Sequence, residues 1–145
     1  MSAISDFAAA LLEGKVPSPP VAELIGFRLV EAGPGRAVFE LEAGPQHANP
    51  MGTLHGGILC DVADAAMGVA FATTLGPGET FTTLELKINF LKPVWVTKLR
   101  AEGKVVKRGK TVGLVECDIL DEEGQLVARV STTQMVLRGE MAKGR

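Results

Sequence analysis

A polar loop that runs directly into a strongly apolar segment constrains this chain more than any other feature. The loop covers residues 47–55, and residues 56–71 read GGILCDVADAAMGVAF. Apolar side chains occur on nearly every side of the helix that this segment predicts, so we expect other elements to enclose it. The only charges on this helix are Asp61 and Asp64. An ionised carboxylate is costly to bury without a partner, so catalysis is the leading explanation for an acid held there.

The segments on both sides of this helix are strand-like, because they carry β-branched residues and partial alternation. Two precede it, at residues 25–30 and 36–42, joined by a predicted hairpin turn at Gly33-Pro34-Gly35. Four follow, at residues 80–91, 97–107, 111–120 and 125–137, with breaks short enough for antiparallel hairpins. This order predicts an α+β fold in which an antiparallel sheet of five to six strands wraps round one long central helix.

The length of 145 residues, 46% of them hydrophobic, suits one domain with a substantial core. We expect residues 25–139 to form that domain, residues 1–24 to form a helical flank and residues 140–145 to form a tail. In the flank, Ser5 or Asp6 is the expected N-cap of a short helix. Neither the flank nor the central helix has the length and apolarity of a membrane span, so no membrane role is predicted.

Charge and cysteine content limit the expected partners and compartment. The formal net charge of -2 gives no general attraction to nucleic acid or to anionic membranes. Cys60 and Cys117 lie where small apolar residues belong, and no metal-ligand spacing links them. With only two histidines and no cysteine cluster, we expect no metal site. A reduced, cytoplasmic protein is predicted.

The start of the predicted helix carries the sequence His55-Gly56-Gly57. Backbone N–H groups at residues 56–58 are expected to lack intrahelical partners and to lie at the positive end of the helix dipole, where they could bind an oxyanion. Asp64 lies eight residues beyond Gly56, or about 12 Å along the helix axis. Because catalytic groups must lie about 3 Å from the reacting atoms, we expect an antiparallel copy of the helix in a second subunit to supply the other group.

These residues closely resemble a motif of the hotdog-fold acyl-CoA thioesterases of the phenylacetic acid degradation type. The matching pattern is His47-x-Asn49, then His55-Gly56-Gly57, then Asp64 followed by Ala-Ala-Met-Gly. The resemblance covers about residues 26–137. It implies a hotdog fold and the hydrolysis of an acyl-CoA thioester, with coenzyme A as part of the substrate and no other cofactor. Aromatic acyl groups of the phenylacetyl type, or medium-chain groups, are the implied substrates.

The resemblance implies a role for each matching residue. Asp64 is the acid, which acts as general base towards water or as a nucleophile, and the Gly56 N–H polarises the thioester carbonyl. His55 helps to hold the substrate or leaving group, and Asn49 faces the acid across a subunit interface. Thr83, on the strand after the helix, falls near a hydroxyl that some members use.

Further substrate contacts rest on weaker patterns. Gly57 is a candidate for substrate binding beside Gly56. Thr82 competes with Thr83, because a slip of one residue in a strand reverses the face. The basic turn Lys107-Arg108-Gly109-Lys110 could meet the phosphates of coenzyme A by charge-assisted hydrogen bonds, and a solvated turn is an equally good interpretation.

Two alternative functions remain open. A hotdog dehydratase or hydratase uses a histidine and an acid fourteen positions apart, which is the spacing of His47 and Asp61. Against this, His47 is expected to bond within its loop, and Asp61 in the first helical turn suits the helix dipole as a structural residue. A non-catalytic sensor would bind acyl-CoA without turnover.

The predicted assembly is a homodimer with shared active sites, paired further into a dimer of dimers.

Overall fold

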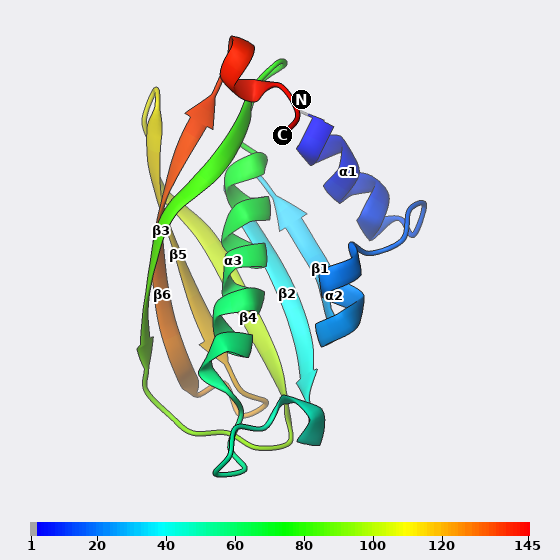
Figure 1. Ribbon diagram of the computed structural model, residues 1–145, viewed down its shortest axis with the longest axis vertical. Helices are drawn as coiled ribbons and strands as arrows, with labels where there is room; N and C mark the ends of the chain where they lie inside the picture. Colours follow the sequence, from blue (N-terminus) through cyan, green and yellow to red (C-terminus); the bar gives the residue numbers. More distant parts are fainter. Residues whose placement is uncertain (1–2) are drawn as a thin grey trace.

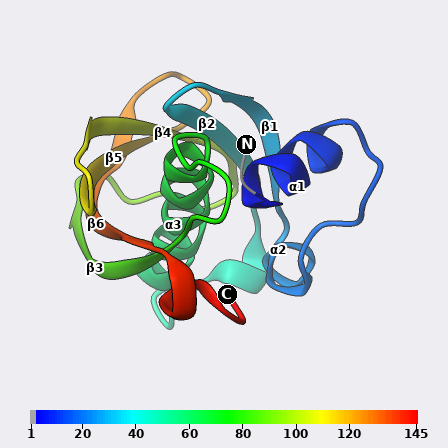
Figure 2. The ribbon, with the colours of Figure 1, turned by 90° about the horizontal axis from the view of Figure 1, so that it is seen from above.

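The computed structural model describes residues 3–145. Its helices and strands are α1 (Ala3–Leu12), α2 (Pro20–Ile25), β1 (Phe27–Gly33), β2 (Arg36–Ala43), α3 (Gly56–Ala72), β3 (Thr80–Phe90), β4 (Thr97–Arg108), β5 (Val112–Leu120) and β6 (Leu126–Leu137). Short 3-10 turns lie at Pro45–His47 and Gly139–Ala142. The six strands form one antiparallel sheet in the order β1-β2-β4-β5-β6-β3, which curls round α3 (Figures 1 and 2). The predicted hotdog fold is confirmed.

The central helix packs closely on the sheet through its small residues. At Gly103 of β4, an added Cβ would lie 2.6 Å from the Ala66 carbonyl oxygen, so only glycine permits this approach. Eight of its 17 residues are buried, and seven of these are apolar residues before its last position. One strip stays open in the single chain, and Asp61 and Asp64 both lie on it. The two carboxylates therefore occupy the part of the helix that the sheet does not cover.

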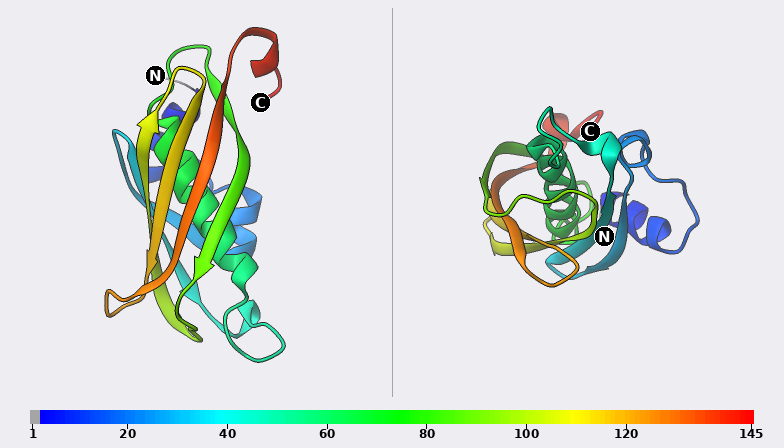
Figure 3. Two further views of the ribbon diagram at one scale, coloured as in Figure 1. Left: turned by 90° about the vertical axis from the view of Figure 1, so that its left-hand side faces the viewer. Right: turned by 90° about the horizontal axis from the view of Figure 1, so that it is seen from below.

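Strands β1 and β3 form the two edges of the sheet, and only one of these edges is flanked. Helices α1 and α2 lie beside β1, and α1 packs on both β1 and α3 (Figure 2). No strand within residues 3–145 pairs with the outer edge of β3 (Figure 3). A bulge at Leu84 interrupts the pairing of β3 with β6. It lets Thr83 before the bulge and Phe90 after it both face α3.

The N-terminal helix begins earlier than the capping prediction requires. Because α1 includes Ala3, neither Ser5 nor Asp6 is its N-cap, and that prediction is wrong. The Ser5 hydroxyl instead donates to the Ala72 carbonyl oxygen at 2.7 Å, which ties α1 to the last turn of α3. Among residues 3–145, no helix combines the length and the apolar character needed to cross a bilayer.

Candidate active site

The N-terminus of α3 offers one free backbone donor rather than three. His55 is the N-cap, and its Nδ1 accepts a hydrogen bond from the Gly57 N–H at 3.0 Å. The Ile58 N–H donates to the His55 carbonyl oxygen at 3.1 Å. Within the described residues, the Gly56 N–H donates to no acceptor. The prediction of three free N–H groups is therefore corrected to Gly56 alone, the position that the resemblance assigns to oxyanion binding.

The surroundings of Gly56 explain why a glycine stands there. An added Cβ would lie 2.8 Å from the Phe90 ring, which packs over this first turn. A cavity of about 410 Å³ lies beside Gly56, between the loop that holds Asn49 and the segment after Phe90. The Asn49 Oδ1 accepts hydrogen bonds from two backbone N–H groups of its own loop, and its Nδ2 donates to Thr53 Oγ1 at 2.6 Å. Asn49 thus shapes the loop beside the donor, and its role across an interface stays a prediction.

Asp64 lies in the middle of α3 and faces β3. The Thr83 hydroxyl lies 3.5 Å from Asp64 Oδ1 and 3.0 Å from Gln134 Oε1. Thr83 pairs with Gln134 in the sheet, so both side chains face the helix, whereas Thr82 faces the other way. The strand register therefore places Thr83, and not Thr82, in contact with Asp64.

The environment of Asp64 raises its pKa above the ordinary value for an aspartate. The main cause is partial desolvation, because neighbouring side chains remove some of the water around the carboxylate and disfavour its charge, while Asp64 itself stays exposed in the single chain. The Thr83 hydrogen bond opposes this rise, and the negative charge of Asp61, one turn earlier, adds to it. A carboxylate with a raised pKa is a stronger base and is better suited to take a proton from water.

An apolar cavity of about 380 Å³ has Asp61 and Asp64 in its wall. It lies between α1, β1 and α3, and its apolar lining includes Phe7, Leu11, Phe27, Leu29, Ala65 and Val69. The N-terminal flank therefore forms one wall of the cavity beside the candidate acid. The sequence could not reveal this, because the cavity depends on how α1 docks on the rest of the fold.

His47 is buried, and both of its ring nitrogens contact the backbone. The Gly44 N–H donates to Nδ1 at 3.1 Å, and Nε2 lies 2.6 Å from the Ile25 carbonyl oxygen. Because Nδ1 accepts, Nε2 carries the hydrogen and donates to Ile25. The prediction of a loop hydrogen-bonder is confirmed. Because both ring nitrogens are engaged, His47 is not free to act as the catalytic histidine that the dehydratase alternative requires.

The basic turn lies at the other end of α3 from Gly56, in the hairpin between β4 and β5. Arg108 is engaged within the fold, since it pairs with Glu79 at 3.1 Å and lies over the Phe71 ring. Lys107 and Lys110 are exposed. These two lysines are the cations of the turn that stay open to a ligand, and their role remains a prediction.

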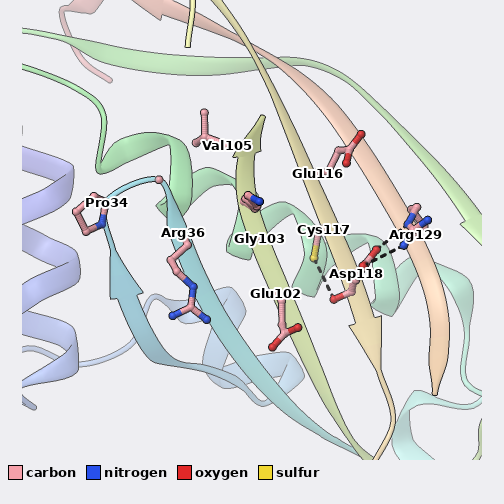
Figure 4. A pocket seen from close by; sticks show the side chains of 11 residues that line it. Pro34, Arg36, Glu102, Gly103, Val105, Glu116, Cys117, Asp118 and Arg129 are labelled. Carbon is pink, nitrogen blue, oxygen red and sulfur yellow. Dashed lines mark hydrogen bonds and ion pairs between the residues drawn. The ribbon is translucent and has the colours of Figure 1, made fainter. Parts of the chain in front are cut away.

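A larger cavity of about 510 Å³ lies on the face of the sheet away from α3, and it offers no comparable chemistry (Figure 4). Most of its charged side chains form ion pairs with one another or with close neighbours. Asp118 accepts from Arg129 at 2.8 Å, and Arg36 pairs with Glu31 at 3.2 Å. Burial raises the pKa of the Cys117 thiol to about 12, so this thiol is not a nucleophile near neutral pH.

Gln134 is a neighbour of the site that the sequence interpretation missed. It is fully buried on β6 and contacts Thr83. A clue was present, because Val130, Thr132, Gln134 and Val136 alternate on the inward face of the predicted strand, and a polar amide among them is unusual. Phe90, which packs on Gly56, had no such sequence clue.

Comparison with known proteins identifies the family of this chain. The family model of the thioesterase superfamily matches residues 51–128, more than half of the 145-residue chain. The 1,4-dihydroxy-2-naphthoyl-CoA hydrolase of Listeria monocytogenes is 30% identical over 105 residues, which cover 72% of this chain and 85% of the relative. Acyl-coenzyme A thioesterase 13 of Homo sapiens is 28% identical over 103 residues, covering 70% and 73%.

Solved structures point the same way. A phenylacetic acid degradation-related protein from Ralstonia eutropha superimposes with a TM-score of 0.80 at 28% identity, covering 89% of this chain and 98% of its own. Sequence and fold therefore point to one family. The chain belongs to the thioesterase superfamily, with the hotdog fold and the enzymatic character of its acyl-CoA hydrolases.

Proposed function

We propose that this protein hydrolyses acyl-CoA thioesters to the free acid and coenzyme A. The observation that carries the proposal is an acid in the wall of an apolar cavity, on the same helix whose first N–H has no acceptor among residues 3–145. In one route, Asp64 takes a proton from a water molecule as that water attacks the thioester carbonyl carbon. In the other route, the Asp64 carboxylate attacks this carbon itself and forms a mixed anhydride, which water then hydrolyses to the free acid and the regenerated carboxylate. The Gly56 N–H donates to the oxyanion that forms. The thiolate of coenzyme A then leaves readily, because thiols are far more acidic than alcohols. The reaction needs no cofactor.

Each active site is proposed to combine two subunits. Gly56 and Asp64 of one chain lie about 12 Å apart along α3, too far to act on one carbonyl. The unpaired edge of β3 is suited to pair with β3 of a second copy, and Leu84 and Phe90 are exposed on that strand. Antiparallel pairing would bring the Gly56 end of one helix towards Asp64 of the other. Further pairing into a dimer of dimers is part of the proposal.

The acyl group is proposed to occupy the apolar cavity beside Asp64. A volume of about 380 Å³ with an apolar lining suits an aromatic or medium-chain acyl group. The Listeria monocytogenes relative is named for an aromatic acyl-CoA, which supports the aromatic class. Lys107 and Lys110 are the proposed contacts for the phosphates of coenzyme A.

The two free thiols, Cys60 and Cys117, fit a reducing cytoplasm, which is the proposed location of the protein.

A panel of acyl-CoA esters tests this proposal directly. We expect the purified protein to release free thiol from phenylacetyl-, benzoyl- and octanoyl-CoA, measured with a thiol reagent, and to act more slowly on palmitoyl-CoA, whose chain exceeds the cavity. Loss of enoyl absorbance from an enoyl-CoA, without thiol release, would instead establish a hydratase. Binding of acyl-CoA with neither reaction would establish a sensor. Either of these two results would overturn the proposed hydrolysis.

A further inference from the structure

Gln134 has an unusual environment for a buried amide. Its side chain is fully buried, and its Nε2 has no hydrogen-bond partner in the described part of the chain. Buried N–H donors are rarely left unpaired, since each loses its hydrogen bonds to water. The other end of the same amide lies beside the candidate site, with Oε1 at 3.0 Å from Thr83 Oγ1. The orientation of this amide therefore decides what Thr83 can do.

The Thr83 hydroxyl has one hydrogen and two neighbouring acceptors, Gln134 Oε1 at 3.0 Å and Asp64 Oδ1 at 3.5 Å. If the Thr83 hydroxyl donates to Gln134, the Asp64 carboxylate receives no hydrogen bond from it. A rotation of the Gln134 amide group by about 180° swaps its oxygen and nitrogen, which then occupy almost the same two positions. Nε2 then donates to Thr83 Oγ1, and the hydroxyl hydrogen is left for Asp64. The buried atom without a partner becomes a carbonyl oxygen, which is tolerated better than an unpaired N–H.

We propose that Gln134 is a positioning residue for Asp64, acting through a chain of hydrogen bonds from Gln134 Nε2 to Thr83 Oγ1 and from Thr83 Oγ1 to Asp64 Oδ1. The amide fixes the direction of the hydroxyl, and the hydroxyl holds the carboxylate towards the substrate. Donation to Thr83 also polarises its O–H bond and strengthens the second hydrogen bond. This inference rests on the proposed function, because it assigns Gln134 to the same acid.

The other charged or titratable groups around this carboxylate come from two elements. On α3, the Asp61 carboxylate lies one turn earlier and the Cys60 thiol lies nearby. On β1, Arg28 lines the same cavity and pairs with Glu40 at 3.2 Å. The sides of β3 and β6 that face the carboxylate contribute the neutral groups of Thr83 and its partner amide. The hydrogen-bond chain is therefore a separate influence that can be removed without changing any charge.

The substitution Gln134→Met tests which group donates in these hydrogen bonds. It keeps a similar volume and removes the amide donor. We expect the pKa of Asp64, read from the carboxyl carbon by NMR titration, to rise by about half a unit as the carboxylate loses a strengthened hydrogen bond. The kcat should fall about threefold with little change in KM. If the amide oxygen instead takes the hydroxyl hydrogen, the substitution frees that hydrogen for Asp64 and lowers its pKa, which would overturn the proposal.

Two further variants separate positioning from general packing. The substitution Thr83→Val already removes the hydrogen bonds that link Gln134 to Asp64, so adding Gln134→Met should shift the Asp64 pKa no further. An additional shift would contradict action through Thr83. Thr132→Val is the matched control, because Thr132 is also fully buried on β6 and donates to the Glu85 carbonyl oxygen rather than to the site. It should leave the Asp64 pKa unchanged.

The NMR readout also keeps this inference distinct from the proposed function. It needs no substrate, so a wild-type protein that releases no thiol would refute acyl-CoA hydrolysis without affecting the pKa result. A thioesterase in which Gln134→Met leaves the pKa unchanged would refute only the role of Gln134. If the Met variant does not fold, Gln134→Leu also lacks the donor and should shift the pKa in the same direction.

Discussion

Replacing Asp64 with Asn is expected to lower kcat for acyl-CoA hydrolysis by about a thousandfold or more. Asparagine has nearly the same shape but can neither take a proton from water nor attack the thioester carbonyl. General base catalysis alone contributes about 10²–10⁴-fold, and loss of a nucleophile removes at least as much. Since the acyl-CoA contacts remain, KM should change little. Steady-state rates of thiol release from phenylacetyl-CoA measure both quantities.

The same variant should remain folded, which separates lost chemistry from lost structure. Partial desolvation raises the pKa of Asp64 above its ordinary value of 3.8, so the folded state binds this proton more tightly than the unfolded state. The contribution of this group to stability is therefore greatest below pH 3.8 and falls as the pH rises through the raised pKa. At neutral pH the ionised carboxylate opposes folding. The Asn variant should thus melt at the wild-type temperature or above it.

Asp61→Asn is the matched control for this experiment, since Asp61 lies one turn earlier and lines the same cavity. A thioesterase that works through Asp64 should retain most of its activity in the Asp61 variant. The hydratase alternative requires the reverse order. Substantial thiol release by the Asp64→Asn variant would contradict the assignment of this acid.

The second large effect is expected at Gly56. Proline is well tolerated at the first position of a helix, where its missing N–H is not needed for the helix. His55 already has the extended conformation that a following proline requires, with φ -65° and ψ 132°. Gly56→Pro therefore removes the proposed oxyanion donor while the helix is retained. Loss of one such donor lowers kcat by about 10²–10³-fold, which is the expected result in the same assay.

Gly56→Ala is the control that isolates the N–H group. Its Cβ would also lie 2.8 Å from the Phe90 ring, so both substitutions displace that exposed ring. Only proline removes the donor. We expect the alanine variant to lose much less activity than the proline variant. Equal losses would mean that packing against Phe90, and not the N–H, matters for catalysis.

The elements that form through local patterns were predictable from the sequence. The glycine-rich turn before β2 and the largely apolar sequence of α3 were recognisable without knowledge of the rest of the chain. The start of β1 was harder, because Ile25 reads as the beginning of a strand and instead ends α2. Pro20 stands at the first position of α2, where proline is favoured although it is unfavourable inside a helix.

The candidate site was only partly predictable, since much of it depends on contacts between distant segments. Asp64 and Gly56 stand out in the sequence as an acid and a glycine on an apolar helix. The contact of Asp64 with Thr83 depends on strand register, which the bulge at Leu84 adjusts. Which N–H stays free depends on the orientation of the His55 ring, and a sequence does not show that orientation.

The central claim is that each active site takes its acid from one subunit and its N–H donor from the other. Chains with Asp64→Asn and chains with Gly56→Pro, each nearly inactive alone, can be co-expressed with different tags and purified as mixed dimers. In a mixed dimer, one site holds both intact groups and the other holds neither, so we expect about half of the wild-type activity per dimer. Mixed dimers no more active than the two parents would contradict the shared site.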